Sequence, residues 1–453
     1  MSVETSSATN AAGARALESA RAGVRWAATH GVTRAVMHRR ARSGNPDAVL
    51  LVDPAHQADP FSTYERMRTA EPFTTGAFSR VTVHHDVCTS VLRSEDFGVA
   101  DRNDSMPTPI RLALRLAGPP PHAGPIDPPS MLAVDAPDHT RYRRLVSRAF
   151  TPRAVGALRE RTETIASDLL DAMEAGPGSV DLVDRYASLL PVTVISEMLG
   201  APADMRSKIL AWGDGAASSL DMGLERQRFH RVEADVAALH DWMTAHLRRL
   251  RRDPGDDLLS RMATVSDDDG SGLSEAELVS TALLVLAAGF ETTVNLVTNG
   301  TALLFAHPEQ RARLAADPSL WPNAVDEILR YDSPVQRTAR RARRDTRVHG
   351  VDVAAGDLVV TVLAAANRDP RVFADPDVVD VNRTNARDHL AFSGGVHFCL
   401  GAALARMEGE VALRALFERF ADLAPAGAPH RRPTRILRGY DAMPVTLGVS
   451  WRV

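Results

Sequence analysis

The chain has 453 residues and a formal net charge of −4, and 24% of its residues are charged and 44% hydrophobic, a balance typical of globular proteins. This balance gives no electrostatic reason to expect nucleic-acid binding, and two cysteines are too few for a disulfide framework. No run of eighteen or more apolar residues occurs, so we expect no transmembrane anchor and, by default, a cytoplasmic protein.

Residues 1–45 are predicted to be an N-terminal extension, followed by a single domain over residues 46–453. Residues 1–20 are rich in Ser, Thr, Ala and Gly, a composition that favours disorder. Residues 21–42 mix apolar side chains with six arginines, which indicates an amphipathic helix. Such a helix either rests on a membrane surface or packs on the body of the protein, and packing is the simpler interpretation.

The next part of the chain favours helices over strands. Residues 80–85 alternate like a strand. Residues 104–130 hold eight prolines, which predicts a long irregular loop. Residues 151–250 carry apolar side chains at helical spacing, which predicts a series of helices.

A long buried helix is predicted to begin after Ser274. Ser274 and Glu277 have the spacing of a capping box, and residues 278–290 are uncharged throughout. Short β regions are expected over residues 338–348 and 358–363, and another helix over residues 402–420. The predicted fold class is therefore mainly α, with small β sheets.

The stretch Ala391–Gly401 contains the more informative cysteine. Two glycines precede Cys399 and one follows it, and a helical pattern begins directly afterwards. A thiol at a helix N-terminus is expected to have a lowered pKa, and its thiolate could ligate a metal or attack an electrophile. The plainer alternative is a buried free cysteine. Cys88 follows His84 and His85, but adjacent imidazoles in a strand point to opposite faces, so core packing is favoured over a zinc site.

Within the long helix, the segment Ala288–Thr293 departs from what helix stability favours. Gly289 costs about 1 kcal/mol in a helix interior, Glu291 places a carboxylate in an apolar stretch, and Thr292 is a poor helix former. Such departures are expected where function overrides stability. One hypothesis is that Gly289 clears space, Thr292 hydrogen-bonds dioxygen and Glu291 supplies protons. The alternative is a helix end or kink with a solvated glutamate.

A third segment combines histidine with several arginines. His139 and Arg143 lie four residues apart and share one helical face, while Arg141, Arg144 and Arg148 lie on the opposite side. The outer arginines are either simply solvated or a landing site for an acidic electron-donor protein, and the pattern does not decide between these interpretations.

The order of these segments resembles the cytochrome P450 family. The pattern Phe392-x-x-Gly395-x-x-x-Cys399-x-Gly401 is similar to the haem-binding loop of that family at every specified position. The acid–alcohol pair after Ala-Gly in residues 288–293 resembles its oxygen-activation motif. The chain most resembles soluble actinobacterial members.

The resemblance extends from about residue 53 to the C-terminus. Glu327-x-x-Arg330, by itself a common surface ion pair, resembles the family's buried Glu-x-x-Arg element, with Arg383 as candidate third partner. Ser393-Gly394 departs from the family pattern, since many bacterial members carry Gly-His there. This departure leaves the hydrogen bonding around the loop open.

The resemblance implies a triangular, mainly α domain that holds haem b between the long helix and the cysteine loop. Cys399 would be the axial iron ligand, and Thr292 and Glu291 would be the catalytic residues. The other residues that the resemblance places around the haem are His139, Arg143, Arg340, His397, Phe392, Gly289 and Gly401.

The implied reaction inserts one atom of O2 into an organic substrate and reduces the other to water. We expect a largely apolar small molecule of lipid, terpenoid, polyketide or steroid type. Electrons would come from a ferredoxin and ferredoxin reductase, because the chain shows no flavin or iron–sulfur segment. The segments expected to line the substrate are 104–130, the Met222 region, 285–289, 335–339 and 440–443.

Three other functions remain as alternatives. A peroxide-driven peroxygenase would use the same fold, and a haem-binding sensor or carrier would have no turnover. The adjacent Glu291 and Thr292 argue against both. A cysteine-nucleophile enzyme is a remoter alternative, because no histidine and carboxylate present themselves as a base for Cys399.

Overall fold

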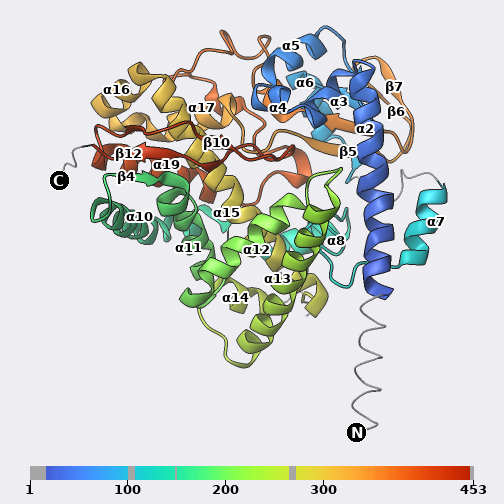
Figure 1. Ribbon diagram of the computed structural model, residues 1–453, viewed down its shortest axis with the longest axis horizontal. Helices are drawn as coiled ribbons and strands as arrows, with labels where there is room; N and C mark the ends of the chain where they lie inside the picture. Colours follow the sequence, from blue (N-terminus) through green and yellow to red (C-terminus); the bar gives the residue numbers. More distant parts are fainter. Residues whose placement is uncertain (1–16, 100–107, 148–149, 265–271, 449–453) are drawn as a thin grey trace.

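The computed structural model describes residues 17–99, 108–147, 150–264 and 272–448, and its outline is roughly triangular in Figure 1. Helices dominate, so the predicted mainly α class is confirmed. The first helices are residues 17–26, α2 (Val32–Arg42), α3 (Pro46–Val52), α4 (Pro54–Ala58), α5 (Phe61–Arg68), α6 (His85–Arg93), α7 (Thr108–Ala117), α8 (Asp138–Ser147), α9 (Pro152–Gly156), α10 (Arg159–Glu174) and α11 (Leu189–Met198). The later helices are α12 (Arg206–Ser218), α13 (Arg226–Arg252), α14 (Leu258–Thr264), α15 (Glu275–Ala306), α16 (Pro308–Ala316), α17 (Trp321–Tyr331), α18 (Leu363–Ala366) and α19 (Ala402–Arg419).

The strands form small sheets, as predicted. One sheet has the order β1-β2-β8-β5-β3, another the order β4-β12-β9, and β6-β7 and β10-β11 form pairs. β2 and β8 are parallel, whereas the neighbouring β5 and β8 are antiparallel. The strands are β1 (Thr74–Thr75), β2 (Arg80–Thr82), β3 (Phe97–Gly98), β4 (Ser179–Asp181), β5 (Thr338–Ala342), β6 (Thr346–Val348), β7 (Val351–Val353), β8 (Leu358–Thr361), β9 (Ala424–Pro425), β10 (His430–Arg431), β11 (Tyr440–Ala442) and β12 (Pro444–Thr446).

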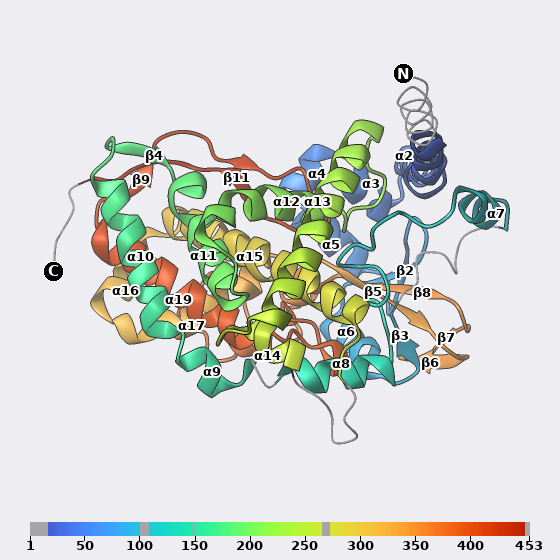
Figure 2. The same ribbon diagram turned by 90° about the horizontal axis from the view of Figure 1, so that it is seen from below.

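α15 runs through the interior of the protein (Figure 2). It begins at the predicted capping box, in which Ser274 Oγ accepts from the Glu277 N–H and the Glu277 carboxylate accepts from the Ser274 N–H. It packs against α11, α12, α13, α17 and α19. Within the described residues it is the one helix long and apolar enough to cross a membrane, but 78% of its most apolar window is buried inside the protein. Its apolar surface therefore has protein partners.

The helix over residues 17–26 and α2 pack on the body of the protein. Trp26 Nε1 donates to the Leu224 carbonyl oxygen at 3.0 Å. The Arg25 guanidinium is buried and donates to the Glu233 carboxylate of α13 at 3.2 Å. The packed arrangement is therefore confirmed for the amphipathic segment.

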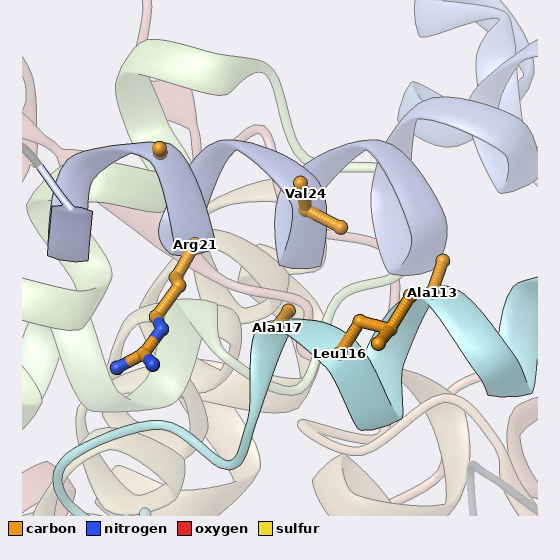
Figure 3. Close-up of a pocket in the computed structure, with 6 residues that line it drawn as sticks. Arg21, Val24, Ala113, Leu116 and Ala117 are labelled. Atoms are coloured by element: carbon orange, nitrogen blue, oxygen red, sulfur yellow. The ribbon is translucent and has the colours of Figure 1, made fainter.

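The predicted disorder of residues 1–20 is wrong for residues 17–20, which are helical because they continue the amphipathic pattern; residues 1–16 lie outside the described part. This first helix lies beside α7, and the two border a surface pocket (Figure 3). Val24, Leu116 and Ala113 give the pocket an apolar lining. No residue of the predicted haem site lines it.

The irregular loop predicted over residues 104–130 is wrong for residues 108–117, which form α7. Pro109 lies in the first turn of α7, where a missing N–H costs nothing. The following residues are mostly apolar or arginine and favour a helix. Residues 118–137 then form turns and irregular backbone, whereas residues 104–107 lie outside the described part.

A buried ion network connects α17 with the segment that follows α18. Arg330 donates two hydrogen bonds to the Glu327 carboxylate, at 2.6 and 2.8 Å, and Arg383 donates another at 3.2 Å. Glu327 and Arg330 are fully buried. Both arginines also donate to backbone carbonyls within residues 367–378. The buried element and its predicted third partner are confirmed, and the surface-pair alternative is wrong.

Cys88 is a core residue. It lies in α6 with no exposed surface and packs with Leu92 and Leu363. Burial raises the pKa of its thiol. The His84 ring nitrogens contact the Ala70 carbonyl oxygen and the Arg371 guanidinium, so they have partners other than a metal. Core packing is confirmed, although the strand ends at Thr82, before the two histidines.

Candidate functional site

The loop before α19 holds Cys399 by backbone contacts. The Cys399 N–H donates to the Phe392 carbonyl oxygen at 3.0 Å, across the one-turn helix Gly395–His397. Phe392 is buried, and the Arg406 guanidinium of α19 lies 4.6 Å from the centre of its ring. The loop is therefore closed on itself, Cys399 keeps accessible surface, and Gly401 lies at the start of α19.

Two residues of this loop have left-handed backbone conformations. Gly395 has a φ of 66°, and a Cβ built on it would lie 2.1 Å from the Leu92 carbonyl oxygen, so only glycine fits. Ser393 has a φ of 61°, where a residue with a side chain costs about 1 kcal/mol. Its N–H still donates to the Leu390 carbonyl oxygen at 2.8 Å. The departure at Ser393 thus adds strain but keeps the turn closed.

The expectation that a helix N-terminus lowers the pKa of the Cys399 thiol is wrong for the polypeptide without a bound cofactor. The surrounding protein desolvates the sulfur and raises that pKa, although the residue keeps accessible surface, and the Gly401 N–H, Arg143 and Arg406 only partly offset the effect. α19 begins at Ala402, so its dipole acts on the sulfur from beyond the first turn. A thiolate here needs a bound metal cation, which deprotonates a coordinating thiol outright.

One face of α15 is accessible although the rest of its middle section is buried. Between residues 278 and 301, all residues are buried except Leu284, Ala288, Gly289 and Thr292. Leu284, Ala288 and Thr292 recur every four residues and so share one face. The Thr292 hydroxyl donates to the Ala288 carbonyl oxygen at 2.8 Å, and its oxygen can still accept a hydrogen bond.

Gly289 makes room for α11. A Cβ built on it would lie 3.1 Å from Cδ1 of Ile195, which is tighter than usual van der Waals contact. α15 is continuous through this segment, so the alternative of a helix end is wrong. The glycine is explained by close packing of two helices.

Glu291 lies on a buried face of α15. Its carboxylate is 3.1 Å from the Arg432 guanidinium, which also pairs with Asp214 of α12. Burial raises the pKa of Glu291 to about 7, although Arg432 opposes the shift. The alternative of a solvated glutamate is therefore wrong. The Thr292 hydroxyl does not bond to this carboxylate but to the backbone of its own helix.

The structure brings together the four predicted basic residues from three elements. His139 and Arg143 lie in α8, Arg340 in β5 and His397 in the cysteine loop. The ring centres of His139 and His397 are 4.1 Å apart. Burial, followed by Arg340 and His139, lowers the pKa of His397 to about 4. Asp135, which the sequence did not indicate, lies 3.6 Å from His397 Nε2.

This cluster fits the propionates of a haem. Arg340 is 6% exposed and donates to two neutral acceptors, the Thr338 hydroxyl and the Ala339 carbonyl oxygen. Burial lowers the pKa of both Arg340 and Arg143, which shows that their charge is incompletely compensated. Carboxylates are the natural partners of such cations. A Cβ built on Gly401 would meet nothing within 4 Å, so space is also open beside the cysteine.

Of the three outer arginines of α8, Arg141 is tied to another element. Arg141 donates to the Glu277 carboxylate and to the Gly272 carbonyl oxygen, which ties α8 to the start of α15. Arg144 is exposed, and Arg148 lies outside the described residues. The simple solvated interpretation is therefore wrong for Arg141.

Glu408 is a buried acid that sequence analysis missed. It lies in α19 and is 2% exposed. Burial raises its pKa to about 8, although a hydrogen bond from Thr293 acts in the opposite direction. A signal was present in the sequence, because Glu408 follows buried Leu404 by four residues and precedes buried Val411 by three. A carboxyl group therefore occupies the apolar face of the helix.

We expect Glu408→Gln to flatten the dependence of stability on pH. In wild type, the unfolded chain releases the Glu408 proton near its usual pKa of 4.5, whereas the folded protein keeps it to about pH 8. The neutral Glu408 carboxyl therefore makes its full contribution to the free energy of unfolding below pH 4.5. This contribution is lost as the pH rises to about 8. At pH 8 the variant should be more stable by about 1–3 kcal/mol. Chemical denaturation across this range tests it, and parallel pH curves for the two proteins would contradict it.

Comparison with known proteins agrees with this geometry. A family model described as cytochrome P450 matches residues 319–438. Cytochrome P450 140 of Mycobacterium tuberculosis is 49% identical over 426 residues, covering 93% of this chain and 97% of that protein. The 6-deoxyerythronolide B hydroxylase of Saccharopolyspora erythraea is 44% identical over 69% of this chain and 76% of its own length.

Solved structures show the same fold. The ligand-free CYP164A2 of Mycobacterium smegmatis superposes with a TM-score of 0.78 at 36% identity, covering 87% of this chain and 98% of that one. The epothilone D-bound cytochrome P450epoK gives a TM-score of 0.78 at 30% identity, over 88% and 98% of the two chains. The length and identity of these matches establish the relationship, and the chain belongs to the cytochrome P450 family of haem-dependent monooxygenases.

Proposed function

We propose that this chain uses haem b to insert one atom of dioxygen into a largely apolar small molecule. One observation carries the proposal: an accessible cysteine and a cluster of four basic side chains belong to one site. Arg143 connects them, because it interacts electrostatically with both Cys399 and His139. Residues 46–453 would form the single domain that encloses this site.

Each predicted residue has a proposed part in binding the cofactor. Cys399 supplies the sulfur ligand, and the Gly401 N–H donates to that sulfur. His139, Arg143, Arg340 and His397 hold the propionates, and Phe392 anchors the loop in the hydrophobic core. Bound there, a haem iron with a thiolate ligand supplies the chemistry of O–O bond cleavage, because the sulfur donates electron density.

Thr292 and Glu291 are proposed to manage protons. The accessible Thr292 hydroxyl can accept one hydrogen bond and donate its own proton when it leaves the Ala288 carbonyl oxygen. The Glu291 carboxyl, with a pKa of about 7, can release and regain a proton near neutral pH. Because Arg432 holds that carboxylate, we propose that the Glu291–Arg432 pair controls when the proton is released.

The substrate is proposed to be a lipid, terpenoid, polyketide or steroid. The accessible face of α15 offers the aliphatic side chains of Leu284 and Ala288, and Met222 is 40% exposed. Relatives are named for 6-deoxyerythronolide B and vitamin D(3), and solved neighbours hold testosterone and epothilone D. The predicted wall segment 440–443 fits less well. Tyr440 and Asn299 line a pocket that does not include the accessible face of α15.

We further propose a cytoplasmic protein that receives electrons from a ferredoxin and its reductase. The family uses external redox partners, and the paired acid and alcohol at Glu291–Thr292 suit activation of dioxygen with delivered protons. The test is an assay of the purified protein with NAD(P)H, ferredoxin and ferredoxin reductase against an apolar substrate library. A second arm uses peroxide as the only oxidant. Product that forms only with peroxide would favour a peroxygenase, and absence of turnover in both arms would favour a sensor or carrier.

Thr292→Ala is expected to uncouple oxygen consumption from product formation. The change removes the hydroxyl on the accessible face of α15 but leaves Cys399 and its surroundings intact. Product formed per O2 consumed should therefore fall about tenfold or more, while the carbonyl spectrum of the reduced enzyme stays of the thiolate type. Parallel measurement of O2, NAD(P)H and product tests this. Thr298→Ala, which removes a buried hydroxyl from the same helix, is the control. A tightly coupled Thr292→Ala enzyme would contradict the assignment.

A further inference from the structure

Three side chains that take no part in the predicted haem site have the donor atoms of a metal site. His122 lies in the loop of residues 118–137, between α7 and α8, while His240 and Asp241 lie in α13. His122 Nε2 is 3.0 Å from Asp241 Oδ1, and His240 Nδ1 is 3.9 Å from the same oxygen. One ligand atom from each residue lies within 4.8 Å of the other two.

Both imidazoles have ring nitrogens that lack protein partners. Within the described residues, the Nδ1 atoms of His122 and His240 are buried and accept or donate no hydrogen bond. The two ring centres are only 5.0 Å apart.

We propose that His122, His240 and Asp241 bind a divalent cation of the zinc class, with water completing the coordination. Two imidazoles and a carboxylate are donors that zinc accepts, whereas magnesium and calcium prefer oxygen donors. With metal–ligand bonds of about 2.0–2.2 Å, tetrahedral ligand atoms lie about 3.3 Å apart. The distances from Asp241 to the two histidines fall on either side of that value. Asp241 is 71% exposed, so an ion can reach the site from solvent.

The ion would fasten the loop of residues 118–137 to α13 (Figure 1). His122 follows three consecutive prolines, whose fixed φ angles limit its backbone freedom. The loop already approaches α13 nearby, since a Cβ built on Gly124 would lie 3.7 Å from Val236. It leads directly into α8, which carries His139. Zinc is therefore expected to slow hydrogen exchange in residues 118–137.

The first measurement is a calorimetric titration of the untagged, haem-loaded protein with zinc chloride. We expect one zinc ion per chain at a dissociation constant in the micromolar range, and binding about tenfold or more weaker in His122→Ala and in His240→Ala. His230→Ala is the matched control, because His230 lies on the same helix but contacts Glu233. It should bind zinc as wild type does. Thermal unfolding midpoints verify that all variants fold.

The second measurement is hydrogen–deuterium exchange with and without zinc. Protection in residues 118–137 of wild type and its loss in both site variants would support the site. Wild type that binds zinc no more tightly than roughly 100 µM, or no more tightly than the two site variants, would overturn it. Binding without protection of the loop would place the ion elsewhere and would also overturn it. Neither readout depends on catalytic activity or on the identity of the substrate.

Discussion

Glu327→Gln is expected to lower the free energy of unfolding by about 3–5 kcal/mol. The substitution keeps the shape of the side chain but removes the charge that compensates Arg330 and Arg383. Both guanidinium groups would stay in the interior, because Arg330 is fully buried and Arg383 is 9% exposed. Their remaining partners are mostly backbone carbonyls, which satisfy hydrogen bonds without neutralising charge. Since whole domains are stable by only about 5–15 kcal/mol, much of the chain should fail to retain haem.

Chemical denaturation, with the haem content of the purified protein, measures this loss. Asp352→Asn is the matched control, because it removes an acid from an exposed pair in which Arg347 lies 3.5 Å away. An exposed pair contributes little, so the control should unfold at the wild-type denaturant concentration. Equal stability of Glu327→Gln and the control would show that the buried network does not stabilise this fold.

Features that depend on neighbouring residues were predictable from the sequence. The capping box of Ser274 and Glu277 involves residues three apart, so its pattern predicts its geometry. The pairing of Glu327 and Arg330 is equally local, whereas its burial came only from the family resemblance. The closed loop around Cys399 depends on glycines whose conformational freedom is intrinsic to the residue.

Features that depend on distant partners were not predictable. No sequence pattern near Glu291 indicates that Arg432 is its partner. Arg432 is distant in the sequence but lies next to Glu291 in the fold, and it makes the carboxylate part of a buried pair. Asp135 beside His397 is a similar case. The pKa of Cys399 was predicted in the wrong direction, because a helix N-terminus is visible in the sequence while the desolvation of a side chain is not.

Cys399→Ala is expected to abolish oxygenation and the thiolate-type carbonyl spectrum, because it removes the only accessible sulfur of the two cysteines. Cys88 cannot replace it. Its side chain is fully buried against Leu92 and Leu363. Reaching a haem from that position would require α6 to leave the core.

Cys88→Ala is therefore the matched control for the same chemical change. It should retain the thiolate-type spectrum and turnover, and lose only about 1 kcal/mol of stability for the small cavity left in the core. Haem content must be measured in both variants, since the cluster of His139, Arg340 and His397 can hold propionates without a sulfur ligand. A Cys399→Ala protein that binds haem but shows a nitrogen-ligated or ligand-free spectrum assigns the sulfur to position 399. A thiolate spectrum that survives in Cys399→Ala and disappears in Cys88→Ala would reverse the assignment and with it the proposed site.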